Sequence, residues 1–155
     1  MASLYKELLD QTDTQITALS LPGITSNVVS LKNASIGAKH VSSLPVCLLS
    51  PFGQPAMISG GPGDTIGANA IEYPVAVLLV QAGNRNQSSN LDRMAQWLED
   101  IVMEFHHKAL TSGITAGKRA YSCVVSPKDT FQQSAGLDNL DVGGLVLRFQ
   151  CQINR

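Results

Sequence analysis

The sequence has little charge and few aromatic residues. Charged residues make up 15% of the chain and aromatic residues 5%, whereas ordinary soluble domains are about 25% charged. The 11 basic and 12 acidic side chains nearly cancel, which argues against the basic field of a free nucleic-acid-binding protein. The low charge has two interpretations. The protein is a neutral soluble monomer, or part of its surface is buried against other subunits, because interface cores are depleted of charge.

Membrane-spanning runs, a secretory leader and paired cysteines are also missing. No segment reaches the roughly 18 apolar residues that a membrane span needs, and the charged N-terminal region is unlike a signal peptide. Cys47, Cys123 and Cys151 are odd in number, widely spaced and form no Cys-x-x-Cys motif. We therefore expect reduced core thiols in a protein made in a reducing compartment.

Motifs for catalysis and cofactor binding are not found either. The glycine-rich stretch 59–70 lacks the lysine of a phosphate-binding loop, and its glycines are not spaced as in a dinucleotide-binding fingerprint. His106 and His107 are adjacent and His40 is isolated, whereas a zinc site needs three or four converging ligands. The sequence therefore predicts no enzyme, no metal and no cofactor. A catalytic site assembled from distant residues stays an alternative.

The residues that are present fit a single domain over residues 1–155. Apolar residues at helical spacing predict an N-terminal helix over residues 3–18 and a longer one over about 90–109. For the longer helix, Ser89 or Asn90 is the expected N-cap, and Gly113 is expected to stop it.

Apolar and alternating runs predict the strands of one sheet. They cover residues 27–31, 45–49, 71–81, 120–126 and 145–154. The order of helices and strands predicts an α+β fold with a mostly antiparallel sheet and the helices packed on one face.

Three details of this sheet are predicted. Residues 75–80 show no polar alternation, so both faces of that strand should be covered. Tyr121, Cys123 and Val125 are expected on one face of their strand. The stretch 59–70 is too long for a tight turn and is expected to be the tip of a projecting hairpin.

The last predicted strand separates two kinds of side chain. Apolar residues of 145–153 alternate with Val146, Arg148, Gln150 and Gln152, so one face belongs to the core and the other is largely polar and neutral. Two interpretations stay open for the polar face: an ordinary solvent-exposed surface, or a surface that lines a channel or meets a neighbouring subunit.

This layout resembles the tail-terminator family of tailed bacteriophages, which includes the tail-completion proteins of the neck. The resemblance extends over nearly the whole chain. It is carried by residues 43–52 (SLPVCLLSPF), 73–80 (YPVAVLLV), 90–105 and 141–149 (DVGGLVLRF). The family has no catalytic signature, so the resemblance is one of order and pattern.

The resemblance implies a structural virion protein. Its copies form a ring, hexameric in the family, that caps the tail tube and docks to the head connector. The implied partners are other copies of the chain, the tail tube protein and the connector or neck protein, with DNA only as passing cargo and no membrane. The implied location is the tail or neck of the virion, after assembly in the host cytoplasm.

The same resemblance implies which residues make contacts. The projecting hairpin, residues 50–72, would touch the next subunit or the tube, and the sheet would face the channel. The expected interface residues are Ser59, Gly60, Gly61, Asp64, Thr65, Ile66, Asn69, Lys118 and Arg119. The expected channel-facing residues are Arg148, Gln150 and Gln152. Only Arg148 is charged among these last three, a departure that puts an electrostatic role toward DNA in doubt.

Other functions stay open at this point. Another neck or head–tail joining protein is not separable from a terminator by sequence. A small ligand-binding α+β module would need a pocket with converging polar groups, and the sequence offers no obvious set. Fold resemblance alone does not establish function.

Overall fold

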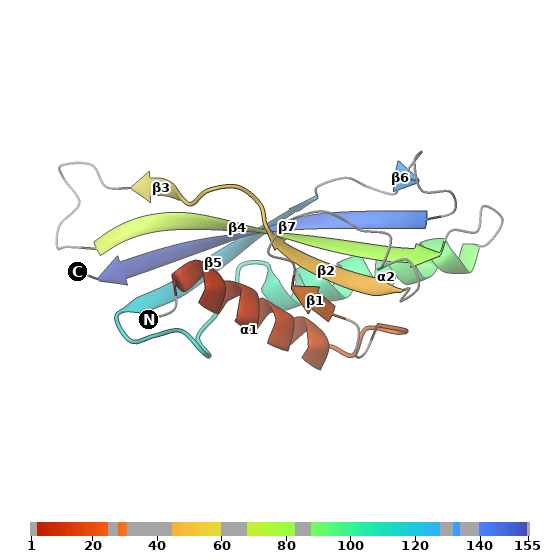
Figure 1. Ribbon diagram of the computed structural model, residues 1–155, viewed down its shortest axis with the longest axis horizontal. Helices are drawn as coiled ribbons and strands as arrows, with labels where there is room; N and C mark the ends of the chain where they lie inside the picture. The colour runs from red at the N-terminus through yellow and green to blue at the C-terminus, as the bar shows by residue number, and fades with distance from the viewer. Residues whose placement is uncertain are drawn as a thin grey trace.

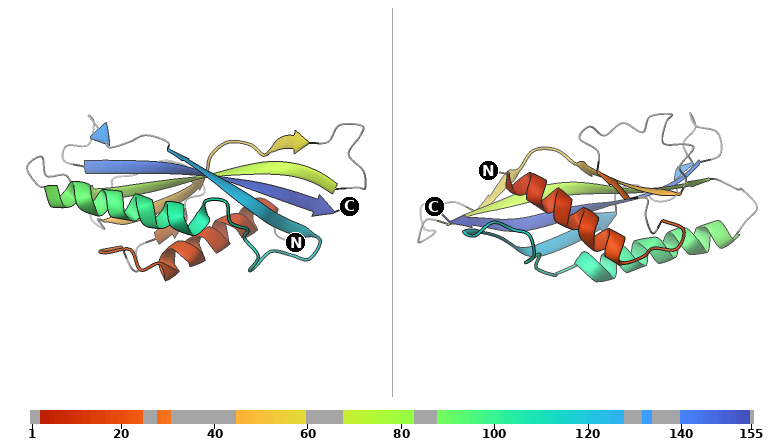
Figure 2. Two further views of the ribbon diagram at one scale, coloured as in Figure 1. Left: turned by 180° about the vertical axis from the view of Figure 1, so that it is seen from behind. Right: turned by 60° about the horizontal axis from the view of Figure 1, so that its bottom comes forward.

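The computed structural model describes residues 3–24, 28–30, 45–59, 68–82, 88–127, 132–133 and 140–154. Within these ranges the chain forms two helices and one seven-stranded sheet. Both helices lie on the same side of the sheet (Figure 1, Figure 2). The predicted α+β fold is therefore confirmed. In the described part of the chain, no helix is long and apolar enough to cross a membrane.

The sheet has the strand order β1-β2-β4-β7-β5. Only β1 pairs in parallel, with β2, and the other described pairings are antiparallel. β3 pairs with β4 beyond the end of β2, and β6 pairs with β7. In chain order the strands are β1 (Val28–Ser30), β2 (Val46–Pro51), β3 (Ala56–Ser59), β4 (Ala68–Ala82), β5 (Lys118–Pro127), β6 (Gln132–Gln133) and β7 (Leu140–Asn154).

The core fills the space between the helices and one face of the sheet. The first helix, α1 (Leu4–Ala18), contacts β1 and β2, and the second, α2 (Ser88–Phe105), contacts β4, β5 and β7. Burial of each large apolar side chain contributes about 1.5–3 kcal/mol before conformational entropy is counted. The main contributors are Leu4, Leu8 and Ile16 of α1, Met94, Trp97, Ile101 and Phe105 of α2, Val75, Val77 and Leu79 of β4, and Leu145, Leu147, Phe149 and Cys151 of β7.

The second helix differs from its prediction at both ends. It starts at Ser88, so Ser89 and Asn90 lie inside the helix and neither is its N-cap. It stops at Phe105, well before Gly113, because His107 takes a left-handed backbone conformation (φ 57°) and its N–H donates to the Cys123 carbonyl at 2.8 Å. A contact with a distant strand therefore ends the helix, which the local sequence does not reveal.

The fifth strand also corrects a prediction. Tyr121 is exposed and does not share a face with Cys123, which is buried. The pairing with β7 runs through Ala120↔Cys151 and resumes at Ser122↔Gln150, so Tyr121 is the extra residue of a bulge. A bulge shifts the inward and outward alternation by one residue, which is why Ala120 and Cys123 both face the core.

The outer edge of β5 is covered by the chain that follows α2. The Leu110 N–H donates to the Ala120 carbonyl at 2.9 Å, and the His107 N–H occupies the Cys123 carbonyl. The Val125 N–H donates to Nδ1 of His106 at 3.1 Å. We call residues 106–110 the edge cap. They satisfy backbone groups with which another strand would otherwise pair.

Candidate functional site

The predicted interface residues fall into two groups. Gly60, Gly61, Asp64, Thr65 and Ile66 lie outside the described residues. The stem of the hairpin, formed by β3 and the start of β4, lies within the described residues. Ser59 ends β3 and pairs with Ala70 of β4. Asn69, the remaining hairpin residue, lies in β4 opposite Ile153 of β7.

The predicted channel-facing residues lie on the sheet face opposite the helices. Phe149 and Cys151 point into the core between helices and sheet. Successive residues of a strand point to opposite faces, so Arg148, Gln150 and Gln152 lie on the other face. All three are partly exposed. The alternation predicted for the end of β7 is therefore confirmed.

These polar residues are joined to groups from neighbouring strands. The register places Gln150 beside Glu72 of β4, and Gln152 beside Arg119 of β5. Arg119 donates to Oε1 of Gln152 from Nε at 3.0 Å and from Nη2 at 2.7 Å. The structure thus brings a predicted interface residue and a predicted channel residue together.

Sequence reasoning missed one member of this group. Glu72 lies 3.2 Å from the guanidinium of Arg148 and forms an ion pair with it. Glu72 lies an even number of residues before Ala76 and Val80 in β4, so it shares their sheet face, opposite the helices. The register with β7 places it opposite Gln150 and diagonally across from Arg148. Arg119, Glu72, Arg148, Gln150 and Gln152 together are called the polar end of the sheet below.

We expect the ion pair to matter little for folding. Its side chains are 40% and 25% exposed, and such surface pairs contribute up to about 1 kcal/mol. Arg148→Met, Glu72→Gln and the double variant should therefore unfold at nearly the same denaturant concentration as the parent protein. A coupling energy above about 2 kcal/mol in this double-mutant cycle would contradict the expectation.

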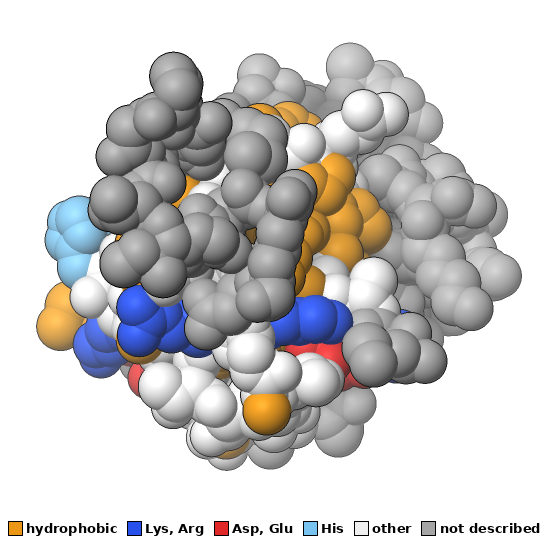
Figure 3. All heavy atoms as spheres, turned by 90° about the vertical axis from the view of Figure 1, so that its left-hand side faces the viewer, with side chains coloured by type: hydrophobic (Ala, Val, Ile, Leu, Met, Phe, Trp, Pro, Cys, Tyr) orange, Lys and Arg blue, Asp and Glu red, His pale blue; other side chains and the backbone are white. Residues whose placement is uncertain are grey.

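The rest of the same sheet face is apolar. Leu48, Ala76, Val80 and Val146 are buried although they lie opposite the helices and outside the main core cluster. This confirms that both faces are covered along residues 75–80, where only Leu78 is partly exposed. Val146 shares this face with Arg148 and is part of its apolar area. Seen end-on, charged side chains form a band with hydrophobic side chains above it (Figure 3).

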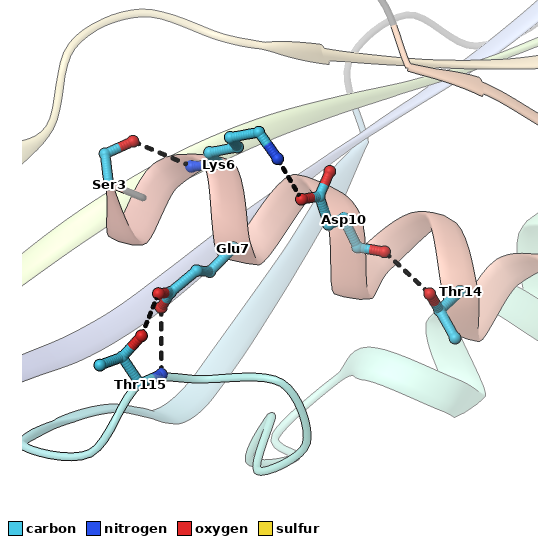
Figure 4. Close-up of polar contacts among 6 residues, drawn as sticks. All are labelled: Ser3, Lys6, Glu7, Asp10, Thr14 and Thr115. Carbon is cyan, nitrogen blue, oxygen red and sulfur yellow. Dashed lines mark hydrogen bonds and ion pairs between the residues drawn. The ribbon is translucent and has the colours of Figure 1, made fainter. Parts of the chain in front are cut away.

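A carboxylate of α1 holds the segment that leads into β5. Glu7 is buried and accepts hydrogen bonds from the N–H of Thr115, at 3.2 Å, and from the Thr115 hydroxyl (Figure 4). The Thr115 hydroxyl lowers the pKa of Glu7 most, burial opposes this, and the Thr115 N–H and the charge of Lys118 lower it further. This contact fixes the start of β5, where Lys118 and Arg119 lie.

The lowered pKa of Glu7 predicts a loss of stability in acid. A carboxyl group whose pKa is lower in the folded state stabilises the fold above its ordinary pKa of 4.5, and this contribution is lost as the pH falls through the folded value. Glu7→Gln should lower the denaturation midpoint at neutral pH and flatten the fall in stability below pH 4.5. Glu99→Gln, at an exposed site of α2, is the control and should leave that pH dependence unchanged.

The histidines and cysteines take structural positions. Nδ1 of His106 accepts a hydrogen bond from the Val125 N–H, and the ring centroids of His106 and His107 lie 3.9 Å apart. Among the described residues, no cluster of three or more His, Cys, Asp or Glu side chains is placed to hold a metal. Burial raises the pKa of each of the three thiols to about 12, which leaves them poor nucleophiles at neutral pH. They are Cys47, Cys123 and Cys151.

Comparisons of the chain with protein families and with curated proteins gave no match. The candidate site is the end of the sheet that carries the hairpin stem. It contains the guanidinium of Arg119, which Gln152 orients, and the ion pair of Glu72 with Arg148. Such a surface has the means to contact another macromolecule through side chains.

Proposed function

We propose that the protein is a tail-terminator subunit of a tailed bacteriophage. Its copies form a ring, hexameric as the resemblance implies, that caps the tail tube and joins it to the head connector. In this role the protein is a structural virion component and not an enzyme. It is assembled in the host cytoplasm and ends in the tail or neck of the particle.

One observation carries the proposal. The described residues that the resemblance assigns to contacts gather at one end of the sheet, although they come from four strands. Ala70 of the hairpin stem pairs with Gln152, and Gln152 pairs with Arg119. A subunit that meets a neighbour, a tube and a channel at one end needs this grouping.

The charge of the predicted channel-facing residues suits a channel for passing DNA. Arg148 is paired with Glu72, and Gln150 and Gln152 are neutral. Each phosphate that a protein neutralises with Lys or Arg strengthens nucleic-acid binding. A channel lining with little net positive charge therefore binds DNA weakly and lets it pass. The low charge of this face is consistent with that role.

The first experiment is native mass spectrometry over a concentration series, with negative-stain electron microscopy of the same samples. We expect closed rings about as wide as a phage tail tube, either alone or after addition of isolated tail tubes. A monomer at every concentration, with and without tubes, would contradict the proposal. Antibody labelling of particles then distinguishes a terminator at the tail end from another neck protein.

A variant at the polar end tests whether assembly needs the Glu72–Arg148 ion pair. Arg148→Met is expected to fold and to form rings, because the ion pair is partly exposed. Rings of the variant should still cap tubes.

A further inference from the structure

Two exposed aromatic side chains lie on opposite edges of the sheet. Among the described residues, the large hydrophobic side chains that are exposed are Phe52 (39%), Tyr121 (42%), Leu91 (55%) and Met103 (73%). Tyr121 belongs to β5 and Phe52 directly follows β2, whereas Leu91 and Met103 belong to α2. Aromatic residues are enriched in protein interfaces.

The register places both aromatic residues at nearly the same level of the sheet. The Phe52 N–H donates to the Pro74 carbonyl at 3.0 Å. Pro74 pairs with Arg148 of β7, which pairs with Val124 of β5. Tyr121 lies next to Ser122, which pairs with Gln150 and through it aligns with Glu72, so the two aromatic residues are offset by about two residues along the sheet.

The Tyr121 edge has features of a built contact surface. The bulge turns Tyr121 away from the core, and bulges commonly re-aim a side chain in this way. Beside it, Arg119 is held by Gln152 through two of its N–H groups, and a guanidinium carries five. The edge cap occupies the backbone groups of β5, so a partner must bind here through side chains and not as an added strand.

The Phe52 edge is equally fixed. The Tyr5 hydroxyl accepts the Phe52 N–H at 3.1 Å and donates to the carbonyls of Gly53 and Pro74. Gly53 has φ 97°, which favours glycine and sets the turn after Phe52. Groups that are already ordered lose less entropy when they bind, so both edges are prepared for contact.

The charges of the two edges are complementary. Helix α1 contacts β1 and β2 on the Phe52 side. It carries Glu7, Asp10 and Asp13 against one basic residue, Lys6, which forms an ion pair with Asp10, so the helix as a whole remains acidic. β5 contains Lys118 and Arg119 and no acidic residue.

We propose that these two edges bind each other between copies of the chain. Tyr121 and Arg119 of one copy pack against Phe52 and the adjoining side of α1 in the next. The inference rests on the ring assembly proposed above and names its contact. Because the two edges differ, the contact is head to tail, and its repetition closes a ring or extends a filament.

Cysteine crosslinking tests the contact directly. Three variants are treated with a short bis-maleimide: Phe52→Cys, Tyr121→Cys and the double variant. The protein concentration is raised well above that at which the parent protein assembles, because loss of either aromatic ring is expected to weaken the contact. The native thiols are buried with raised pKa values, so they should react little. We expect the double variant to give a covalent ladder that ends at the ring number. Each single variant should give no covalent oligomer, and an equimolar mixture of the two single variants should give covalent dimers.

Each outcome separates the inference from the proposed function. Rings without a ladder would overturn the edge contact and leave the terminator proposal standing. A ladder without closed rings would support the contact and count against the terminator. Neither rings nor a ladder would overturn both.

Alanine variants give an independent measure. Phe52→Ala and Tyr121→Ala should each weaken assembly on the order of 30-fold, as loss of a central aromatic anchor does in other interfaces. Met103→Ala removes a more exposed side chain from α2 and is the matched control, with assembly unchanged. Equal losses in all three variants would overturn the edge contact.

Discussion

Replacement of Trp97 by alanine is expected to lower the free energy of unfolding by about 3–5 kcal/mol, the usual cost of removing a buried aromatic side chain. Trp97 is fully buried between α2 and the sheet. Its Nε1 donates to the Pro22 carbonyl at 2.9 Å, and the guanidinium of Arg93 lies 5.1 Å from the ring centroid. Since small domains are stable by about 5–15 kcal/mol, this change should remove a large part of the stability. Chemical denaturation measures it.

Trp97→Phe separates the ring from its hydrogen bond. Phenylalanine keeps much of the buried area but loses the donor to Pro22. This hydrogen bond is only partly buried, so its loss should cost only about 0.5–1.5 kcal/mol. The order of stability should be parent, phenylalanine, alanine. A cost below about 1 kcal/mol for alanine would mean that Trp97 does not link the helix to the segment after α1.

Removal of the hairpin tip is expected to abolish ring assembly while the subunit stays folded. Deletion of residues 59–70, bridged by Asn-Gly, leaves the core cluster intact because none of its residues lies in that range. The variant keeps Ala56 opposite Glu72. It loses the pairing of Ser59 with Ala70 and the pairing of the first three residues of β4 with the end of β7. Circular dichroism should report a folded chain, and native mass spectrometry a monomer.

A second hairpin variant distinguishes length from side-chain contacts. It keeps the native length but replaces residues 60–67 by Ser and Gly. If assembly needs the side chains of the tip, this variant should fail like the deletion. If it needs only the reach of the hairpin, the variant should assemble. Rings from the deletion itself would remove the hairpin from the assembly proposal.

The sequence predicted elements well where a pattern repeats over many residues. Alternation at the end of β7 identified Leu147, Phe149 and Cys151 as core residues, and helical spacing identified Met94 and Ile101. Local patterns failed where a distant segment decides the conformation. The bulge at Tyr121 and the end of α2 both depend on contacts between strands or between helix and strand, and neither contact has a local signal.

The candidate site was predictable only in part. Arg119, Arg148 and Gln152 were named from the sequence, but the contacts Arg119–Gln152 and Glu72–Arg148 depend on the register of three strands. A shift of one residue in either pairing would turn every side chain of a strand to the other face. Composition and periodicity do not determine that register between segments far apart in the chain.

The long pairing of β4 with β7 has a consequence for how the chain reaches its fold. Ala68 pairs with Asn154 and Ala82 with Leu140, so the central ladder joins segments separated by α2 and β5. Distant pairings form late because the intervening loop must first be closed. During synthesis the apolar run of β4 therefore waits without β7 until the chain beyond residue 140 emerges. Such exposed strands are prone to misassembly, so yield should depend on temperature and expression rate more than on the stability of the finished subunit.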